Sequence, residues 1–222
     1  MILARMSGPA RGVRLYRLLV LLGVPLRWWV RLEVRGGEVL PPPEVALLVV
    51  ANHDSMVDPL ALADTLVRAG RPLRFLAMDR LWTWWPVARI LDGIRQIPIR
   101  RGVGDTAALQ HAVAALADGE AICIFPEGGL SQGQPVRARR GVARLIEAAP
   151  HACVVLAAVD GGTDLVRFPR RPRVRVELFL SCGPEPDTQE DHAALAQRLL
   201  AEIRQRVPPT AAGRRVPSGE RL

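Results

Sequence analysis

Residues 45–59 read VALLVVANHDSMVDP, an apolar run that stops at a polar turn and continues into a segment led by proline. The run at 45–51 is too short for a typical helix and reads as a strand, whereas Pro59 suits the first turn of a helix. An uninterrupted apolar run is typical of a parallel strand that is covered on both faces. The stretch therefore predicts a strand, a turn and a helix at the centre of an α/β fold.

The same alternation of apolar runs and helical stretches continues along the chain. Strands are expected at 45–51, 73–77, 96–99, 121–125, 153–159 and 174–180. Helices are expected at 59–69, 79–91, 105–117, 139–149 and 188–206. This order predicts an α/β fold in a single domain, with a largely parallel mixed sheet flanked by helices. The strand at 174–180 alternates and follows a long loop, so we expect it at an edge or antiparallel.

Two terminal segments are expected to flank the domain, which is assigned to 36–206. Residues 1–35 contain an apolar stretch at 18–26 that is much shorter than the ~18 residues of a membrane span. We expect 1–35 to form a helical segment that lies at a membrane interface. Residues 207–222 are rich in Pro, Arg and Gly, which favours a disordered tail.

The tryptophans fall in two groups that suit a membrane surface. Trp28 and Trp29 close the N-terminal apolar stretch, and Trp82, Trp84 and Trp85 crowd a second segment. Amphipathic rings of this kind settle at the headgroup level of a bilayer, and the alternative is a Trp-rich core. We expect a peripheral or monotopic protein at the cytoplasmic face of a membrane.

The charge of the chain indicates an anionic partner. The formal net charge is +8, and all 30 basic residues are Arg. The absence of Lys excludes phosphate-loop lysines and Schiff-base chemistry. Because the chain has a single Tyr and no groove-reading motif, an anionic membrane surface is favoured over nucleic acid.

The cysteines favour neither disulfides nor a zinc site. Cys123, Cys153 and Cys182 stand singly, without CxxC or Cys/His spacing. We expect buried thiols in a reducing compartment, and no metal.

His53 and Asp58 lie five residues apart, where the first apolar run ends. A carboxylate that holds the Nδ1 hydrogen of an imidazole leaves Nε2 able to take a proton from a hydroxyl. Asp58 before Pro59 also fits a helix N-cap, and the two roles can coexist. Inside one regular helix the two residues would face about 140° apart, so His53 is expected in the turn before the helix. The pair predicts a general base.

Two further loops are expected beside this turn, because loops at the carboxyl ends of parallel strands converge at one edge. Arg100 and Arg101 follow the strand at 96–99 and suit a phosphate or carboxylate, or are simply solvated. The stretch FPEGGLS combines a rigid turn, the carboxylate of Glu127 and the consecutive glycines Gly128 and Gly129. Such glycines let backbone amides approach a ligand closely.

In this order, the blocks resemble the glycerolipid acyltransferase family, whose members include 1-acylglycerol-3-phosphate acyltransferases. NHDSMVDP resembles the first family block, so the resemblance implies catalytic roles for His53 and Asp58. RQIPIRRG is similar to the second block, in which an arginine binds the acceptor phosphate. Arg101 is the better match for that arginine, with Arg100 close behind.

The third and fourth blocks match only in part. FPEGGLS resembles a block usually written Phe-Pro-Glu-Gly-Thr-Arg-Ser, which implies substrate binding around Glu127, Gly128, Gly129 and Ser131, although Gly129 and Leu130 depart from it. HACVVLAAVDG takes the place of the fourth block but has Leu156 where a proline is expected.

Leu130 stands where the family has an arginine that helps bind glycerol phosphate. Leucine in place of this arginine removes charge-assisted hydrogen bonds worth about 1.5 to 3 kcal/mol. The missing charge could be supplied by Arg137, Arg139 or Arg140. Otherwise the acceptor is a lipid other than lysophosphatidic acid.

The resemblance implies transfer of a fatty acyl group from an acyl thioester, coenzyme A or acyl carrier protein, to the hydroxyl of a lysophospholipid. His53 would act as base, with no cofactor. No acyl-enzyme is expected, because Cys123 lies in a strand and Ser131 in a binding loop. The alternatives are a lipid-binding protein without turnover, a non-glycerophosphate acceptor, and a metal-dependent hydrolase using His53, Asp54 and Asp58.

Overall fold

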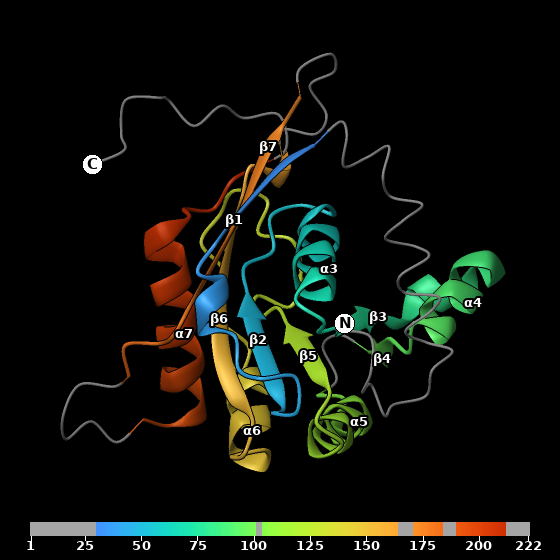
Figure 1. The fold of residues 1–222 in the computed structure, drawn as a ribbon. Helices are drawn as coiled ribbons and strands as arrows, with labels where there is room; N and C mark the ends of the chain where they lie inside the picture. Colours follow the sequence, from blue (N-terminus) through green and yellow to red (C-terminus); the bar gives the residue numbers. More distant parts are fainter. Residues whose placement is uncertain (1–29, 101–103, 164–170, 184–189, 212–222) are drawn as a thin grey trace.

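The computed structural model describes residues 30–100, 104–163, 171–183 and 190–211. Its strands are β1 (Arg31–Arg35), β2 (Leu47–Ala51), β3 (Leu73–Met78), β4 (Ile97–Ile99), β5 (Ala121–Ile124), β6 (Cys153–Asp160) and β7 (Arg173–Phe179). Its helices are α3 (Asp58–Arg68), α4 (Trp85–Gly93), α5 (Thr106–Ala117), α6 (Gly141–Ala148) and α7 (His192–Arg206), with 3-10 turns η1 (Gly37–Val39) and η2 (Asp79–Thr83). Helices cover both faces of the sheet (Figure 1).

The described strands form one seven-stranded sheet in the order β1-β7-β6-β2-β5-β3-β4. All pairs are parallel except β6 with β7. The single α/β domain with a largely parallel mixed sheet is therefore confirmed. The antiparallel direction of β7 is also as expected, but β7 is not an edge strand because β1 pairs along it.

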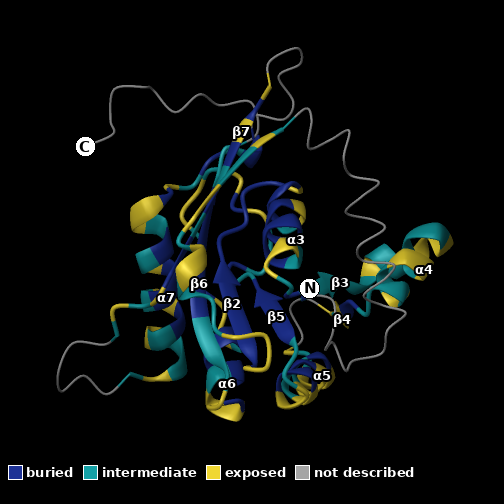
Figure 2. Ribbon diagram, viewed as in Figure 1, coloured by how far each residue is buried: buried dark blue, intermediate teal, exposed yellow. Residues whose placement is uncertain are grey.

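The apolar run that opens the fold forms β2, which lies inside the sheet and is buried at every position. Leu48 and Val50 point into a core that is covered by α5, α6 and α7. Leu47 and Val49 point into the opposite core, beneath α3. Successive residues of a strand face opposite sides, so a continuous apolar run serves both cores. Figure 2 shows the buried strands between partly exposed helices.

The expected boundary of the interfacial segment is wrong at residues 31–35, which belong to the sheet. They form β1, paired in parallel with β7 from Arg31 with Arg173 to Arg35 with Glu177. The strand RLEVR is short, charged and partly exposed, so it carries little hydrophobic signal. Its backbone pairing with a strand far along the chain holds it in place. The rest of the segment, residues 1–29, lies outside the described residues.

The other terminus differs as well. The tail was expected to be disordered from residue 207, but Val207 belongs to the core beneath α7, and Thr210 is also buried. Residues 212–222 lie outside the described part of the chain.

The helix expected at 79–91 is divided in two. The backbone is extended at Trp84, with φ −100° and ψ 105°, between η2 and α4. Pro86 stands in the first turn of α4, where its missing N–H costs nothing. No helix in the described part of the chain combines the length and hydropathy that crossing a bilayer requires.

Parallel pairing decides where the functional loops meet. Since β2, β5 and β6 run in the same direction side by side, the residues after each of them emerge at one edge of the sheet. This edge receives the turn 52–57, the long loop 125–140 and Gly162.

Candidate active site

His53 lies two residues beyond β2, in the turn that leads to α3. Its Nδ1 is 3.4 Å from Oδ2 of Asp58, which is at the long end for a hydrogen bond. Hydrogen bonds between catalytic groups are often this long when no substrate is bound. Its ring stacks on Phe125, with centroids 4.3 Å apart and an interplanar angle of 18°. Two different contacts thus fix the imidazole.

Asp58 is only 1% exposed and is held by the turn before it. Its Oδ2 accepts the backbone N–H groups of Asp54 and Ser55, each at 2.7 Å, and its Oδ1 accepts the Ser55 hydroxyl at 2.8 Å. Helix α3 begins at Asp58 but has no side-chain cap. The carboxylate therefore faces the turn that carries His53 instead of capping the helix.

Asn52 anchors this turn to the sheet, a role the sequence did not reveal. Its Oδ1 accepts the N–H of Val159 at 2.7 Å, and its Nδ2 donates to the carbonyl of Val159 at 2.8 Å. The side chain continues the pairing of β2 with β6 beyond Ala51, the last paired residue of β2. The turn consequently starts from a rigid point.

Glu127 and Ser131, both expected to bind substrate, face the interior beside His53. Oε2 of Glu127 accepts the backbone N–H of His53 at 3.3 Å, and the N–H of Ser131 donates to the carbonyl of His53 at 2.9 Å. The Ser131 hydroxyl donates to Asp54. The loop after β5 thus forms hydrogen bonds with both the N–H and the carbonyl of His53.

Arg204 of α7 completes the site, and no signal in the sequence identified it. Its guanidinium reaches Asp54 and Glu127 from the last turn of the helix. Burial raises the pKa of Glu127, and the charge of Arg204 opposes that rise. Burial by itself lowers the pKa of Arg204, but hydrogen bonds and charge from Asp54 and Glu127 outweigh it and raise the pKa.

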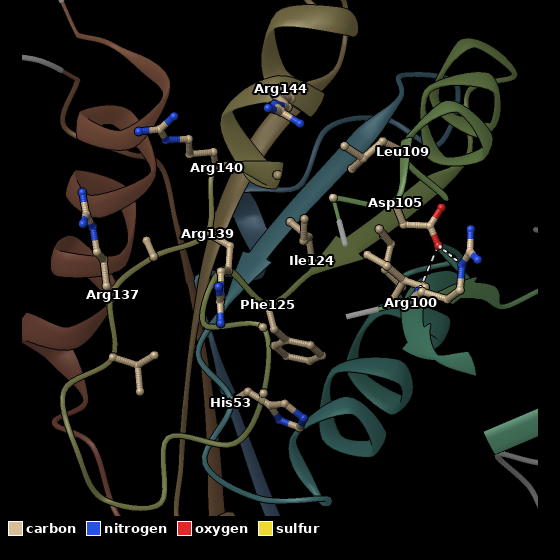
Figure 3. Close-up of a pocket in the computed structure, with 18 of the residues that line it drawn as sticks. His53, Arg100, Asp105, Leu109, Ile124, Phe125, Arg137, Arg139, Arg140 and Arg144 are labelled. Atoms are coloured by element: carbon tan, nitrogen blue, oxygen red, sulfur yellow. Dashed lines mark hydrogen bonds and ion pairs between the residues drawn. The ribbon is translucent and has the colours of Figure 1, made fainter. Parts of the chain in front are cut away.

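A cavity of about 650 Å³ opens at His53 (Figure 3). Gly128 and Gly129 line it. Its apolar wall includes Leu76, Ile99, Leu109, Ile124 and Phe125. Its basic wall includes Arg100, Arg137, Arg139, Arg140 and Arg144. The space therefore suits a ligand with an apolar chain and an anionic group.

Of the two arginines that follow β4, only Arg100 has a described position. Arg100 lines the cavity, and its backbone N–H donates to Asp105 at 2.9 Å. Arg101 lies outside the described residues.

Arg139 lies beside the loop that lacks the family's usual arginine. A Cβ on Gly128 would stand 3.2 Å from Cγ and 3.4 Å from Nε of Arg139, so this side chain passes directly over the glycine. The N–H of Arg139 donates to the carbonyl of Pro126 at 2.7 Å. Leu130 itself is 39% exposed. Of the three arginines proposed as replacements, Arg139 therefore has the closest contact with the glycine turn.

The candidates for other chemistries are placed less favourably. Burial raises the pKa of the Cys123 thiol far above its usual range, so it is a poor nucleophile. Cys153 is half-buried and Cys182 is exposed. The expectation that all three thiols are buried is therefore wrong for these two residues. Asp54, which the metal-hydrolase alternative requires, is bound by Arg204. No cluster of His, Cys, Asp and Glu suited to a metal occurs among the residues with a described position.

The chain is similar to a known family and to individual acyltransferases. The family model described as Acyltransferase matches residues 31–159. The chain is 30% identical to a lyso-ornithine lipid O-acyltransferase of Pseudomonas aeruginosa, over 84% of this chain and 79% of the relative. It is also 30% identical to the human 1-acyl-sn-glycerol-3-phosphate acyltransferase alpha, over 82% of this chain and 65% of that enzyme.

A solved structure has the same fold. The crystal structure of the 1-acyl-sn-glycerophosphate acyltransferase PlsC from Thermotoga maritima superposes with a TM-score of 0.65 and 18% identity, over 91% of this chain and 83% of that one. Together, the family match and the extent of the similarity show that this chain belongs to the PlsC-like glycerolipid acyltransferase family and is an O-acyltransferase.

Proposed function

We propose that the chain transfers a fatty acyl group from an acyl thioester to the hydroxyl of a lysolipid with an anionic headgroup, with His53 as general base. One observation carries this proposal: an imidazole paired with Asp58 lies at a cavity that has an apolar wall and a basic wall. The apolar wall suits the acyl chain, and the arginines suit the headgroup.

The proposed reaction is a direct displacement at the thioester carbonyl. Nε2 of His53 takes the proton of the acceptor hydroxyl as that oxygen bonds to the carbonyl carbon. The C–S bond then breaks, and the imidazolium returns the proton to the leaving thiolate of coenzyme A or acyl carrier protein. Asp58 orients the ring and stabilises the imidazolium. Neither metal nor cofactor is needed, because the imidazole supplies the proton transfer.

The glycine turn is the proposed site of oxyanion stabilisation. The N–H of Gly128 already donates to the carbonyl of Phe125 at 3.0 Å. Gly129 lies next to it on the cavity wall. The backbone amide of Gly129 is therefore assigned to the oxyanion, with Arg139 adding positive charge nearby.

Arg100 and Arg139 are the proposed ligands of the headgroup. The acceptors named for the relatives carry a phosphate or, in lyso-ornithine lipid, a carboxylate, and guanidinium pairs with both anions. Arg139 takes over the role of the arginine that Leu130 replaces.

A lipid screen tests the function. Purified protein receives labelled palmitoyl coenzyme A or palmitoyl acyl carrier protein, together with lysophosphatidic acid or lyso-ornithine lipid. We expect a diacyl product from at least one pair, and its loss in His53→Ala. A folded protein that binds these lipids but consumes no thioester would instead be the non-catalytic lipid binder, and full turnover by His53→Ala would exclude His53 as the base.

We further propose that α4 and η2 contact the anionic surface of the membrane, on its cytoplasmic face. Trp84 and Trp85 are 64% and 70% exposed, and Ile90 is 41% exposed. The exposed Arg80 and Arg89 flank the two tryptophans in the sequence. Rings this exposed argue against a Trp-rich core, and the pattern is typical of interfacial anchoring. Helix α4 stands out from the body beside β3 and β4 (Figure 1).

A further inference from the structure

Arg204 forms a buried ion pair with two carboxylates from different parts of the chain. Its NH1 and NH2 atoms donate to the two oxygens of Asp54, each at 2.8 Å, and its Nε donates to Oε1 of Glu127 at 2.9 Å. The side chains of Arg204, Asp54 and Glu127 are 13%, 4% and 1% exposed. Bidentate pairing of this kind fixes orientation as well as charge.

Both carboxylates control the main chain around His53. Asp54 follows His53 directly, and its N–H donates to the same Asp58 oxygen that faces the His53 ring. Glu127 accepts the N–H of His53 through the oxygen not engaged by Arg204. A shift of either carboxylate therefore moves the backbone that carries the imidazole.

Without the guanidinium, this arrangement would be unfavourable. Two carboxylates buried side by side repel each other and lose hydration, so their positions around His53 would shift. Arg204 bridges the turn before α3 and the loop after β5, so its loss would leave them joined through the hydrogen bonds of His53 and Ser131. The charged groups that surround the His53 turn are Asp58, Asp54, Glu127 and Arg204, with Arg100 and Arg139 on the cavity wall.

We propose that Arg204 is a positioning residue for the acyl transfer, which offsets part of the negative charge of Asp54 and Glu127 and so fixes the place of His53 and the charge around its ring. The inference rests on the proposed role of His53 as base. It makes the end of α7 part of the active site, although α7 lies beyond residues 31–159, where the family model matches.

Two substitutions of similar length separate charge from packing. Arg204→Met removes the positive charge, so the remaining negative charge favours the imidazolium form of His53, which cannot act as a base. We expect the acid limb of the kcat/KM profile to move to higher pH by about one unit. We also expect kcat to fall roughly 100-fold, as for a misplaced catalytic group, with a smaller change in KM. Arg204→Lys keeps the charge and should keep the acid limb at the wild-type pH, with a smaller loss of kcat.

A double-mutant cycle provides a second measurement, and its Glu127→Gln arm keeps Arg204 if Arg204→Met folds poorly. Glu127→Gln removes one negative charge and should move the acid limb to lower pH. The double variant Arg204→Met, Glu127→Gln has the net charge of the wild-type cluster, so its limb should return to the wild-type pH. Effects of residues in contact are expected to be non-additive in this way.

Arg198 provides the matched control on the same helix. It is bound to Glu190 and Glu202, away from the cavity, so Arg198→Met disturbs α7 without touching the site. We expect a lower Tm with an unchanged acid limb.

The outcomes separate this inference from the proposed function. Palmitoyl coenzyme A and the better acceptor of the lipid screen serve as substrates throughout. Full activity of His53→Ala would remove the proposed base and, with it, this inference. If His53→Ala is inactive but none of the Arg204 and Glu127 variants moves the acid limb, then His53 remains the base, and Arg204 only stabilises the fold.

Discussion

Gly162 lies against the carboxylate of Asp58, so closely that a Cβ at this glycine would stand 2.5 Å from Oδ1 of Asp58 and 2.4 Å from Oγ of Ser55. Gly162 follows β6, whereas Asp58 begins α3. Two loops of the sheet edge therefore meet with no room for a methyl group, and the position of the carboxylate depends on a residue far along the chain.

Gly162→Ala should displace Asp58 and loosen the His53 ring. We expect kcat to fall by about 100-fold, in line with the cost of a displacement near 1 Å, with a smaller effect on acceptor KM. Steady-state kinetics with both substrates varied would measure the change. Gly37→Ala is the control, since a Cβ at Gly37 meets nothing within 4 Å. Wild-type kcat in Gly162→Ala would show that Asp58 does not need its present position.

Asp58→Asn tests the carboxylate at nearly constant shape. An amide cannot stabilise the imidazolium, so we expect kcat to fall by roughly 10²- to 10⁴-fold while the protein remains folded. Circular dichroism and single-turnover acyl transfer would be measured together. Asp118→Asn, at the exposed end of α5, should match the wild type. Wild-type activity in Asp58→Asn would contradict the proposed catalytic role of the Asp58 carboxylate.

Arg139→Ala tests the arginine over the glycine turn. Losing charge-assisted hydrogen bonds of about 1.5 to 3 kcal/mol should raise the acceptor KM at least tenfold. The KM for the thioester donor should change less. Arg68→Ala, which breaks a part-buried pair with Asp64 on α3, is the control. Equal effects of the two substitutions on acceptor KM would remove Arg139 from the headgroup site.

Trp84→Ala with Trp85→Ala tests the membrane surface. Since both rings are exposed, their loss should leave Tm nearly unchanged and weaken binding to vesicles containing phosphatidylglycerol by about tenfold. Co-sedimentation at several salt concentrations gives the affinity, and higher salt should weaken binding in both proteins. Trp82→Ala is a poor control because Trp82 donates to Asp92, so Leu180→Ala, another exposed apolar residue, is used instead. Unchanged sedimentation of the double variant would place the contact elsewhere.

Glu127 should make stability depend on pH. Because burial raises its pKa above the ordinary value of 4.5, the folded protein binds this proton more tightly than the unfolded chain. Its contribution to stability is therefore fully present below pH 4.5 and is lost as pH rises through the folded pKa. In urea titrations, wild type should lose stability relative to Glu127→Gln as pH rises through this window. A constant difference between the two proteins would contradict the raised pKa.

Much of the fold follows from local patterns in the sequence. The apolar run of β2, the six expected strands from β2 to β7 and the helices between them rest on hydrophobic periodicity, which neighbouring residues encode. Boundaries were less accurate, as at η2 and α4, where an extended Trp84 interrupts one expected helix. The strand β1 was missed because a charged edge strand is defined by its partner β7 more than by its own composition.

What the sequence by itself determined is the chemistry available at one turn: His53 and Asp58 are five residues apart, so their meeting is a local property of the chain. The tertiary structure alone decided what surrounds them. Arg204 meets Glu127 across 77 residues and Asp54 across 150, and Gly162 reaches Asp58 only because β6 runs parallel to β2. Such contacts leave no periodic trace, because they depend on how the sheet and α7 pack and not on the residues beside them in sequence.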